Sequence, residues 1–192
     1  QIAQTVTFPS MAIRADDADR SSLSAVKAVS PGYPLRGNLR VADAIGQEDR
    51  VTREIPARGE VWVDGQLLQA IGAKPGNALK LGEKTFLISK IITIEPDRGT
   101  QFINFAPRVM LNIEDLAATQ LIANGSRVTY RLLVAGEHPS MRTYSESLQQ
   151  GLRRGQPSAE RDKGLGLTVA DGEDLTGGSD DERDGCADAC RD

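Results

Sequence analysis

Three side chains of the sequence, Ser24, Lys27 and His138, are of types that catalyse reactions in other proteins. Ser24 and Lys27 form an S-x-x-K pair, which serves acyl-transfer enzymes when both residues share one helical face and the amine takes the hydroxyl proton. The surrounding segment alternates polar and apolar residues as a strand does, which would put the two side chains on opposite faces. We therefore expect a solvated strand here rather than an activated nucleophile.

The single histidine and the two cysteines offer no second centre of chemistry. A Ser-His-Asp arrangement would have to use His138, but no G-x-S-x-G motif supplies a nucleophile for it. Cys186 and Cys190 provide at most two thiolates, too few for a closed zinc site. Asn124-Gly-Ser126 fits a glycosylation sequon but is better explained as a turn. The sequence predicts no catalytic, cofactor or metal site, so we expect a protein that is not an enzyme.

The most distinctive stretch is the loop expected between residues 95 and 108, which carries two aromatic residues and several charges. Phe102 and Phe105 either cover the end of a sheet or stand exposed for contact. Asp97 and Arg98 are suited to brace the loop by a charge-assisted hydrogen bond. The surface predicted to contact a substrate or partner comprises Asp97, Arg98, Phe102, Phe105 and Arg108.

Short strands separated by turn residues must position these side chains. Alternating polar and apolar residues between Pro and Gly predict strands at 4–8, 23–29, 37–41, 60–64, 77–81, 85–94, 108–113 and 127–133. The first of them is expected to stop at Pro9. Within 85–94, the alternation predicts one face formed by Phe86, Ile88 and Ile92 and the other by Leu87, Ile91 and Thr93.

A few short helices complete the expected fold. Asp64 can cap a helix that buries Leu67, Leu68 and Ile71 and ends at Gly72. One or two helical turns are expected at 112–118, and the last helix at 140–152, where Met141, Tyr144 and Leu148 share a face. The strands outnumber the helices, so the predicted fold class is α+β with a mostly antiparallel sheet.

Charge is unevenly distributed along the 192 residues, whose net charge is −4. Residues 159–192 hold eleven acidic and four basic side chains. The remainder lacks the basic stripe that nucleic acid binding needs, so no nucleic acid partner is expected. Residues 153–192 are predicted to be a disordered acidic tail, which leaves 1–152 as the folded domain. No apolar run is long enough for a membrane-spanning helix, and no signal peptide is apparent.

Four separated motifs resemble one known family, in the same order along the chain. They are Val29-Ser-Pro-Gly-Tyr-Pro-Leu-Arg-Gly-Asn-Leu-Arg40, Gly59-Glu-Val-Trp-Val-Asp64, Glu95-Pro-Asp-Arg98 and Phe105-Ala-Pro-Arg-Val-Met110. The family is the FtsX-like (MacB-type) ABC transporter permeases, in particular their YbbP-like branch, and the resemblance lies in the large periplasmic domain over residues 1–152. Asn38 stands where this family usually has an acidic residue.

The resemblance implies an α+β domain at the periplasmic face of the bacterial inner membrane, inserted between two transmembrane helices. It implies a cytoplasmic ABC ATPase as partner through the parent permease, a homodimer, and a hydrophobic or lipid-like substrate. The domain would handle or gate that substrate and relay ATP-driven motion without catalysis.

Two other classes of protein stay open, a free-standing periplasmic protein-binding module and a periplasmic hydrolase. A family permease would continue into a membrane span where this sequence has its acidic stretch. A native tail, a truncation and a shifted reading frame are the alternatives for residues 153–192.

Overall fold

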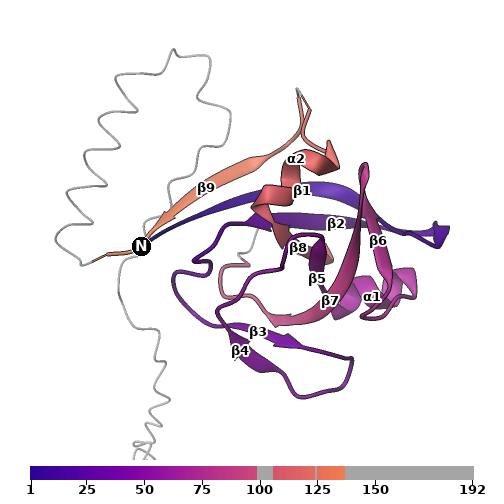
Figure 1. Cartoon of the computed structure of the whole chain (residues 1–192), viewed down its shortest axis with the longest axis horizontal. Helices are drawn as coiled ribbons and strands as arrows, with labels where there is room; N and C mark the ends of the chain where they lie inside the picture. Colours follow the sequence, from indigo (N-terminus) through magenta and orange to yellow (C-terminus); the bar gives the residue numbers. More distant parts are fainter. Residues whose placement is uncertain (99–105, 124, 137–192) are drawn as a thin grey trace, which may run out of the picture.

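The computed structural model describes residues 1–98, 106–123 and 125–136. Strands dominate this part, with two short α-helices and one 3₁₀ turn (Figure 1). The strands are β1 (Ile2–Arg14), β2 (Asp17–Val29), β3 (Leu39–Ala42), β4 (Arg50–Thr52), β5 (Glu60–Asp64), β6 (Ala78–Leu81), β7 (Lys84–Ile94), β8 (Arg108–Asn112) and β9 (Thr129–Val134). The helical elements are α1 (Gly65–Ile71), η2 (Ile113–Asp115) and α2 (Leu116–Thr119). The α+β class expected from the sequence is confirmed.

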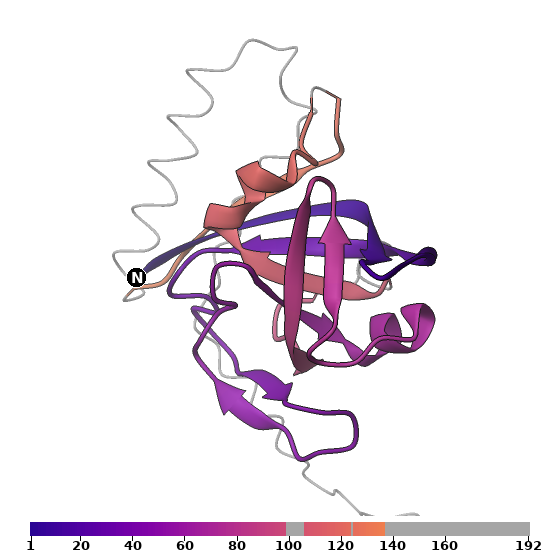
Figure 2. The same cartoon turned by 45° about the vertical axis from the view of Figure 1, so that its right-hand side comes forward.

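Six of the strands form a sheet that closes on itself. Their order is β7-β5-β8-β2-β1-β6, and β6 pairs with β7 to complete the ring (Figure 2). Strands β3 and β4 extend the sheet outward from β7, and β9 adds to β1. Most pairs in the described part are antiparallel, as expected, whereas β2–β8 and β5–β7 are parallel.

Two apolar clusters pack on opposite sides of this sheet. The first draws buried side chains from all six strands of the ring, so it fills the ring's interior. The second lies outside, where β3 and the segment after β2 cover β5 and β8. Alternation assigns the sides, because Val61 and Val63 belong to the inner cluster while Trp62 between them belongs to the outer one.

The strand β7 departs from simple alternation at Ser89. Opposite it, Val61 of β5 pairs with Ile88 but Trp62 pairs with Lys90, so Ser89 is the extra residue of a bulge. The bulge reverses the phase of the following residues. Ile91 therefore packs in the inner cluster and Ile92 in the outer one, and the sequence-based assignment of these two residues is wrong.

The strand β1 runs through Pro9, which was expected to end it. Pro9 lies opposite Ala25, and the amide of Ala25 donates to Pro107 on the other side of β2. Pro9 and Ala25 are therefore a non-hydrogen-bonded pair, and the nitrogen of Pro9 faces away from β2. On that side of β1, the pairing with β9 ends at Thr7 and the pairing with β6 starts at Ile13, so neither strand pairs with Pro9. The missing N–H consequently costs no ladder hydrogen bond.

Both helical segments expected within the described residues are confirmed. The Asp64 side chain accepts from the Leu67 amide at the start of α1, and Gly72 ends the helix in the left-handed conformation. The Asn112 side chain accepts from Glu114 at the start of η2, which leads directly into α2. The helix expected at 140–152 lies outside the described residues. No helix within the described residues is long and apolar enough to cross a membrane.

Gly82, in the turn between β6 and β7, is expected to tolerate no side chain. Its φ is +57°, and a Cβ atom there would lie 2.0 Å from the backbone oxygen of Thr119. Gly82→Ala should lower the free energy of unfolding by about 3 kcal/mol, since overpacking adds to the left-handed backbone cost. Gly76→Ala is the control, because Gly76 also has positive φ but open space around it, and should cost only about 1 kcal/mol. Equal midpoints of the two variants in urea would contradict this prediction.

Candidate functional site

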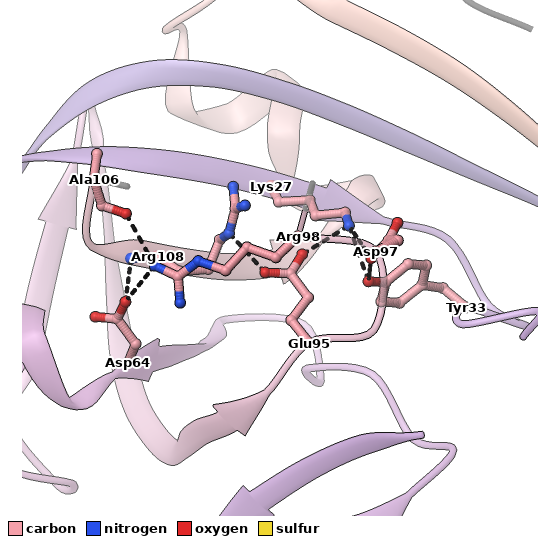
Figure 3. A network of polar contacts seen from close by, with 8 residues as sticks. All are labelled: Lys27, Tyr33, Asp64, Glu95, Asp97, Arg98, Ala106 and Arg108. Atoms are coloured by element: carbon pink, nitrogen blue, oxygen red, sulfur yellow. Dashed lines mark hydrogen bonds and ion pairs between the residues drawn. The ribbon is translucent and has the colours of Figure 1, made fainter. Parts of the chain in front are cut away.

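Figure 3 shows a network of charged side chains. Its strand residues lie on the outer face of the ring, the face that also carries the outer apolar cluster. Lys27 comes from β2, Arg108 from the start of β8 and Asp64 from the end of β5. Three carboxylates and three cations take part, together with one phenol: Asp64, Glu95, Asp97, Lys27, Arg98, Arg108 and Tyr33. Strand alternation brings Lys27 and Arg108 to this face. Lys27 pairs with Met110, which belongs to the outer cluster, and Arg108 lies two residues before Met110 on the same side of β8.

Glu95 is the centre of the network. Its Oε1 accepts from Lys27 Nζ at 2.7 Å, and its Oε2 accepts from Arg108 Nε at 2.8 Å. The side chains are 4 % exposed for Lys27, 0 % for Glu95 and 1 % for Arg108. Buried charges are costly unless they are paired and hydrogen-bonded. The shared carboxylate is therefore what allows both cations to lie inside the protein.

Asp97 and Tyr33 form the outer end of the network. Lys27 Nζ donates to Asp97 Oδ1 at 2.7 Å and to the Tyr33 hydroxyl at 2.9 Å, and that hydroxyl donates to the same Asp97 oxygen. Burial alone would raise the pKa of Asp97, but the charge of Lys27 and these hydrogen bonds hold it below the ordinary value. Burial, with the charges of Asp97 and Glu95, raises the pKa of Tyr33, so its hydroxyl stays protonated.

Asp64 joins the network to the helix α1. Its Oδ1 accepts from the Leu67 amide at 2.9 Å, and its Oδ2 accepts from the Arg108 amide at 2.9 Å and from Arg98 Nη2 at 3.1 Å. Arg98 Nη2 also donates to the Ala106 carbonyl at 3.2 Å. The two segments on either side of residues 99–105 are thus hydrogen-bonded to each other and to Asp64 at the start of α1.

The amine of Lys27 and the hydroxyl of Ser24 have different hydrogen-bond partners. The ammonium of Lys27 contacts two carboxylates and a phenol, while the Ser24 hydroxyl donates to the Ser22 carbonyl. The expectation of a solvated strand at this pair is wrong, since Ser24 is 0 % and Lys27 3 % exposed. The strand itself is as expected and places the two side chains on opposite faces, but both faces are covered here. Ser24 shares the inner face with Val26, and Lys27 lies on the outer face. Among the described residues, no group of His, Cys, Asp and Glu side chains is placed to hold a metal ion.

The residues predicted for the contact surface divide into three groups. Asp97 and Arg98 are about one-third exposed and are held by different partners, Lys27 with Tyr33 for Asp97 and Asp64 with Ala106 for Arg98. Arg108 is buried and supports the network from within. Phe102 and Phe105 lie outside the described residues, as do Asn124, His138, Cys186 and Cys190.

Sequence reasoning missed Lys27, Tyr33, Asp64 and Glu95 as members of one site. A lysine inside the apolar run Ala25-Val-Lys-Ala-Val29 was the available signal, because Lys is almost never fully buried unless it is paired. The other three residues lie within the motifs that carry the family resemblance. What the sequence could not supply is the closed sheet that brings these separated motifs together.

The lowered pKa of Asp97 predicts that acid weakens the fold. A carboxyl whose pKa is lower in the folded protein than its ordinary value of 3.8 stabilises the fold above that pH, and this contribution is lost as the pH falls through the folded-state pKa. Asp97→Asn should therefore flatten the decline of unfolding free energy below about pH 4. Urea unfolding at a series of acid pH values measures the slope, with Glu48→Gln as the control at an exposed carboxylate that has no ion pair with a described residue. An unchanged slope in Asp97→Asn would refute the assignment.

The sequence, compared with known proteins, is similar to part of an ABC transporter permease, and the resemblance seen in the motifs is confirmed. The relative is the uncharacterised ABC transporter permease YbbP of Escherichia coli (strain K12), 29 % identical over 153 residues. The match covers 80 % of this chain but only 18 % of YbbP, so the chain spans less than a fifth of its relative. No protein-family model matches the chain.

One solved structure, a domain of a protein assigned as a permease in Porphyromonas gingivalis, resembles the fold distantly. The TM-score is 0.47 at 15 % sequence identity, over 85 % of this chain and 68 % of that one. A likeness at this level carries no argument about function.

Proposed function

We propose that the chain forms an extracytoplasmic, non-catalytic domain of an ABC transporter permease at the periplasmic face of the inner membrane. The observation that carries this proposal is the similarity to YbbP over 153 residues. In this role the domain handles or gates a hydrophobic substrate and relays motion that an ABC ATPase drives from the cytoplasm.

The arrangement of the first and last described strands supports an inserted domain. The strands β1 and β9 pair antiparallel, so the start of one lies beside the end of the other (Figure 1). Gln1 N donates to the Ala135 carbonyl at 2.7 Å, and the Ala135 amide donates back to the Gln1 carbonyl at 2.9 Å. A domain placed between two membrane segments needs adjacent ends of this kind. A closed sheet fastened by buried ion pairs would pass displacement at these ends to the rest of the domain.

Cysteine labelling tests the side of the membrane on which the domain lies. The gene is expressed in its native context, with Cys186→Ser and Cys190→Ser as background, and Leu23→Cys and Val26→Cys are compared. Leu23 is 58 % and Val26 0 % exposed on the same strand. An impermeant maleimide should label Leu23→Cys after the outer membrane is opened, and Val26→Cys only after denaturation. Labelling of Leu23→Cys only after the inner membrane is lysed would overturn the proposal.

The proposed ATPase partner is tested separately by co-purification. An affinity tag on the permease, solubilised in mild detergent, should recover an ABC ATPase that carries Walker motifs. Recovery of folded permease without an ATPase would favour the free-standing binding module instead. The same preparation reports its own oligomeric state by light scattering and so tests the expected homodimer.

Within this proposal Phe102 and Phe105 contact the hydrophobic substrate, and Asp97, Arg98 and Arg108 position the segment that carries them. Aromatic rings offer large contact area with few rotatable bonds. The double variant Phe102→Ala/Phe105→Ala should leave the free energy of unfolding nearly unchanged while it impairs transport. If both rings instead fill the end of the sheet, each substitution should cost about 3–5 kcal/mol.

A further inference from the structure

A small pocket lies beside the outer end of the charged network. Its volume is about 120 Å³, and its walls are Tyr33, Pro34, Leu35, Arg36, Asp97, Leu133, Val134 and Ala135. Apolar atoms form most of this lining. The volume is close to the roughly 150 Å³ of an apolar cavity that admits a benzene ring. The pocket is therefore large enough for a short alkyl stretch or a small headgroup, but not for a whole lipid.

Asp97 lines this pocket and holds its partners in the network through one carboxylate oxygen. Lys27 and Tyr33 both donate to Oδ1, and neither donates to Oδ2. The side chain is 33 % exposed, and the lowered pKa keeps it ionised at neutral pH. An ionised carboxylate oxygen against apolar walls is a strong acceptor for an ammonium group, because charge-assisted hydrogen bonds are the strong ones.

Arg36 supplies the opposite charge on the same pocket. It is exposed and forms no ion pair with any described residue. A guanidinium binds phosphate or carboxylate through paired N–H donors. The pocket thus presents one anionic acceptor, one cationic donor group and an apolar wall from β9.

We propose that this pocket binds a zwitterionic amphiphile, with an ammonium group on Asp97 Oδ2, an anionic group on Arg36 and an alkyl portion against Leu35 and Leu133. The proposal rests on the proposed function in that it names the chemical class of the substrate or ligand handled by the domain. A phospholipid with an ethanolamine headgroup and a free phosphoethanolamine-like metabolite share the ionic part of this chemistry.

Titration of the isotopically labelled 192-residue chain followed by NMR tests the proposal. Three probes are compared below their micelle-forming concentrations: dihexanoyl phosphatidylethanolamine, phosphoethanolamine without chains, and dihexanoyl phosphatidylglycerol, which lacks the ammonium. The ethanolamine lipid should shift the resonances of Leu35, Leu133 and Ala135. Asp97→Asn and Arg36→Gln should each weaken its binding roughly tenfold, the effect of one lost charge-assisted contact. Arg53→Gln, an exposed arginine away from the pocket, should leave binding unchanged.

Ala135→Trp keeps the test informative if Asp97→Asn perturbs the fold, because it fills the pocket and leaves every charged side chain of the network in the sequence. Binding that survives Ala135→Trp would overturn the proposal, as would phosphatidylglycerol binding as tightly as phosphatidylethanolamine. Equal binding of phosphoethanolamine would show that the alkyl portion adds nothing and would overturn the amphiphile in favour of a soluble ligand, whereas tighter binding of the lipid supports the proposal and points to a membrane source. Absence of binding would refute this pocket yet leave the membrane-side labelling result, and with it the proposed function, intact.

Discussion

Glu95→Gln is expected to lower the free energy of unfolding by roughly 3–5 kcal/mol, the usual cost of removing one partner from a buried ion pair. The substitution preserves the size of the side chain but removes the charge that Lys27 and Arg108 share. Neither cation can reach water, since both side chains are at most 4 % exposed. The amide can still accept one hydrogen bond, so the expected loss comes from unbalanced charge rather than from a cavity.

Urea unfolding of the 192-residue chain measures this loss, with Glu54→Gln as the matched control. Glu54 pairs with Lys90 at 3.0 Å but is 73 % exposed, and exposed pairs contribute at most about 1 kcal/mol. The two variants make the same chemical change at a buried and an exposed pair. If Glu95→Gln cost no more than Glu54→Gln, the network would not be a stabilising element of the fold.

Local elements of this fold follow from the sequence because local rules decide them. The cap at Asp64, the buried face of α1 and the left-handed Gly72 are set by residues within one helical turn of each other. Most strand positions likewise follow from alternation and turn residues, but β4 was not expected, and β1 and β2 extend well beyond the expected 4–8 and 23–29. Where these rules failed, a non-local partner was responsible. Pro9 is tolerated in β1 because of where β9 and β6 stop pairing.

The charged site could not be assembled from the sequence, because it depends on which strands pair. Lys27 and Arg108 come together through the parallel pairing of β2 with β8, and no property of either segment selects that partner. Alternation also gave no information about what packs on the outer face of β2. It predicts which side chains share a face, but not whether that face is covered, and so Lys27 was expected in solvent. The loop carrying Asp97 and Arg98 was singled out from its residue types alone, while the partners of both residues depend on the closed sheet.

Phe86→Ala is expected to lower the free energy of unfolding by roughly 3–5 kcal/mol, as large-to-small changes of buried aromatic residues do. Phe86 is 1 % exposed within the inner cluster, whereas its neighbour Leu87 is 45 % exposed on the other face of β7. Leu87→Ala should therefore cost less than about 1 kcal/mol, although it also shortens an apolar side chain of the same strand. Urea unfolding of the two variants compares the inside of the ring with its outside. The bulge at Ser89 follows both residues, so Phe86 and Leu87 lie on the faces that simple alternation predicts. A larger loss of unfolding free energy for Leu87→Ala than for Phe86→Ala would contradict the closed sheet.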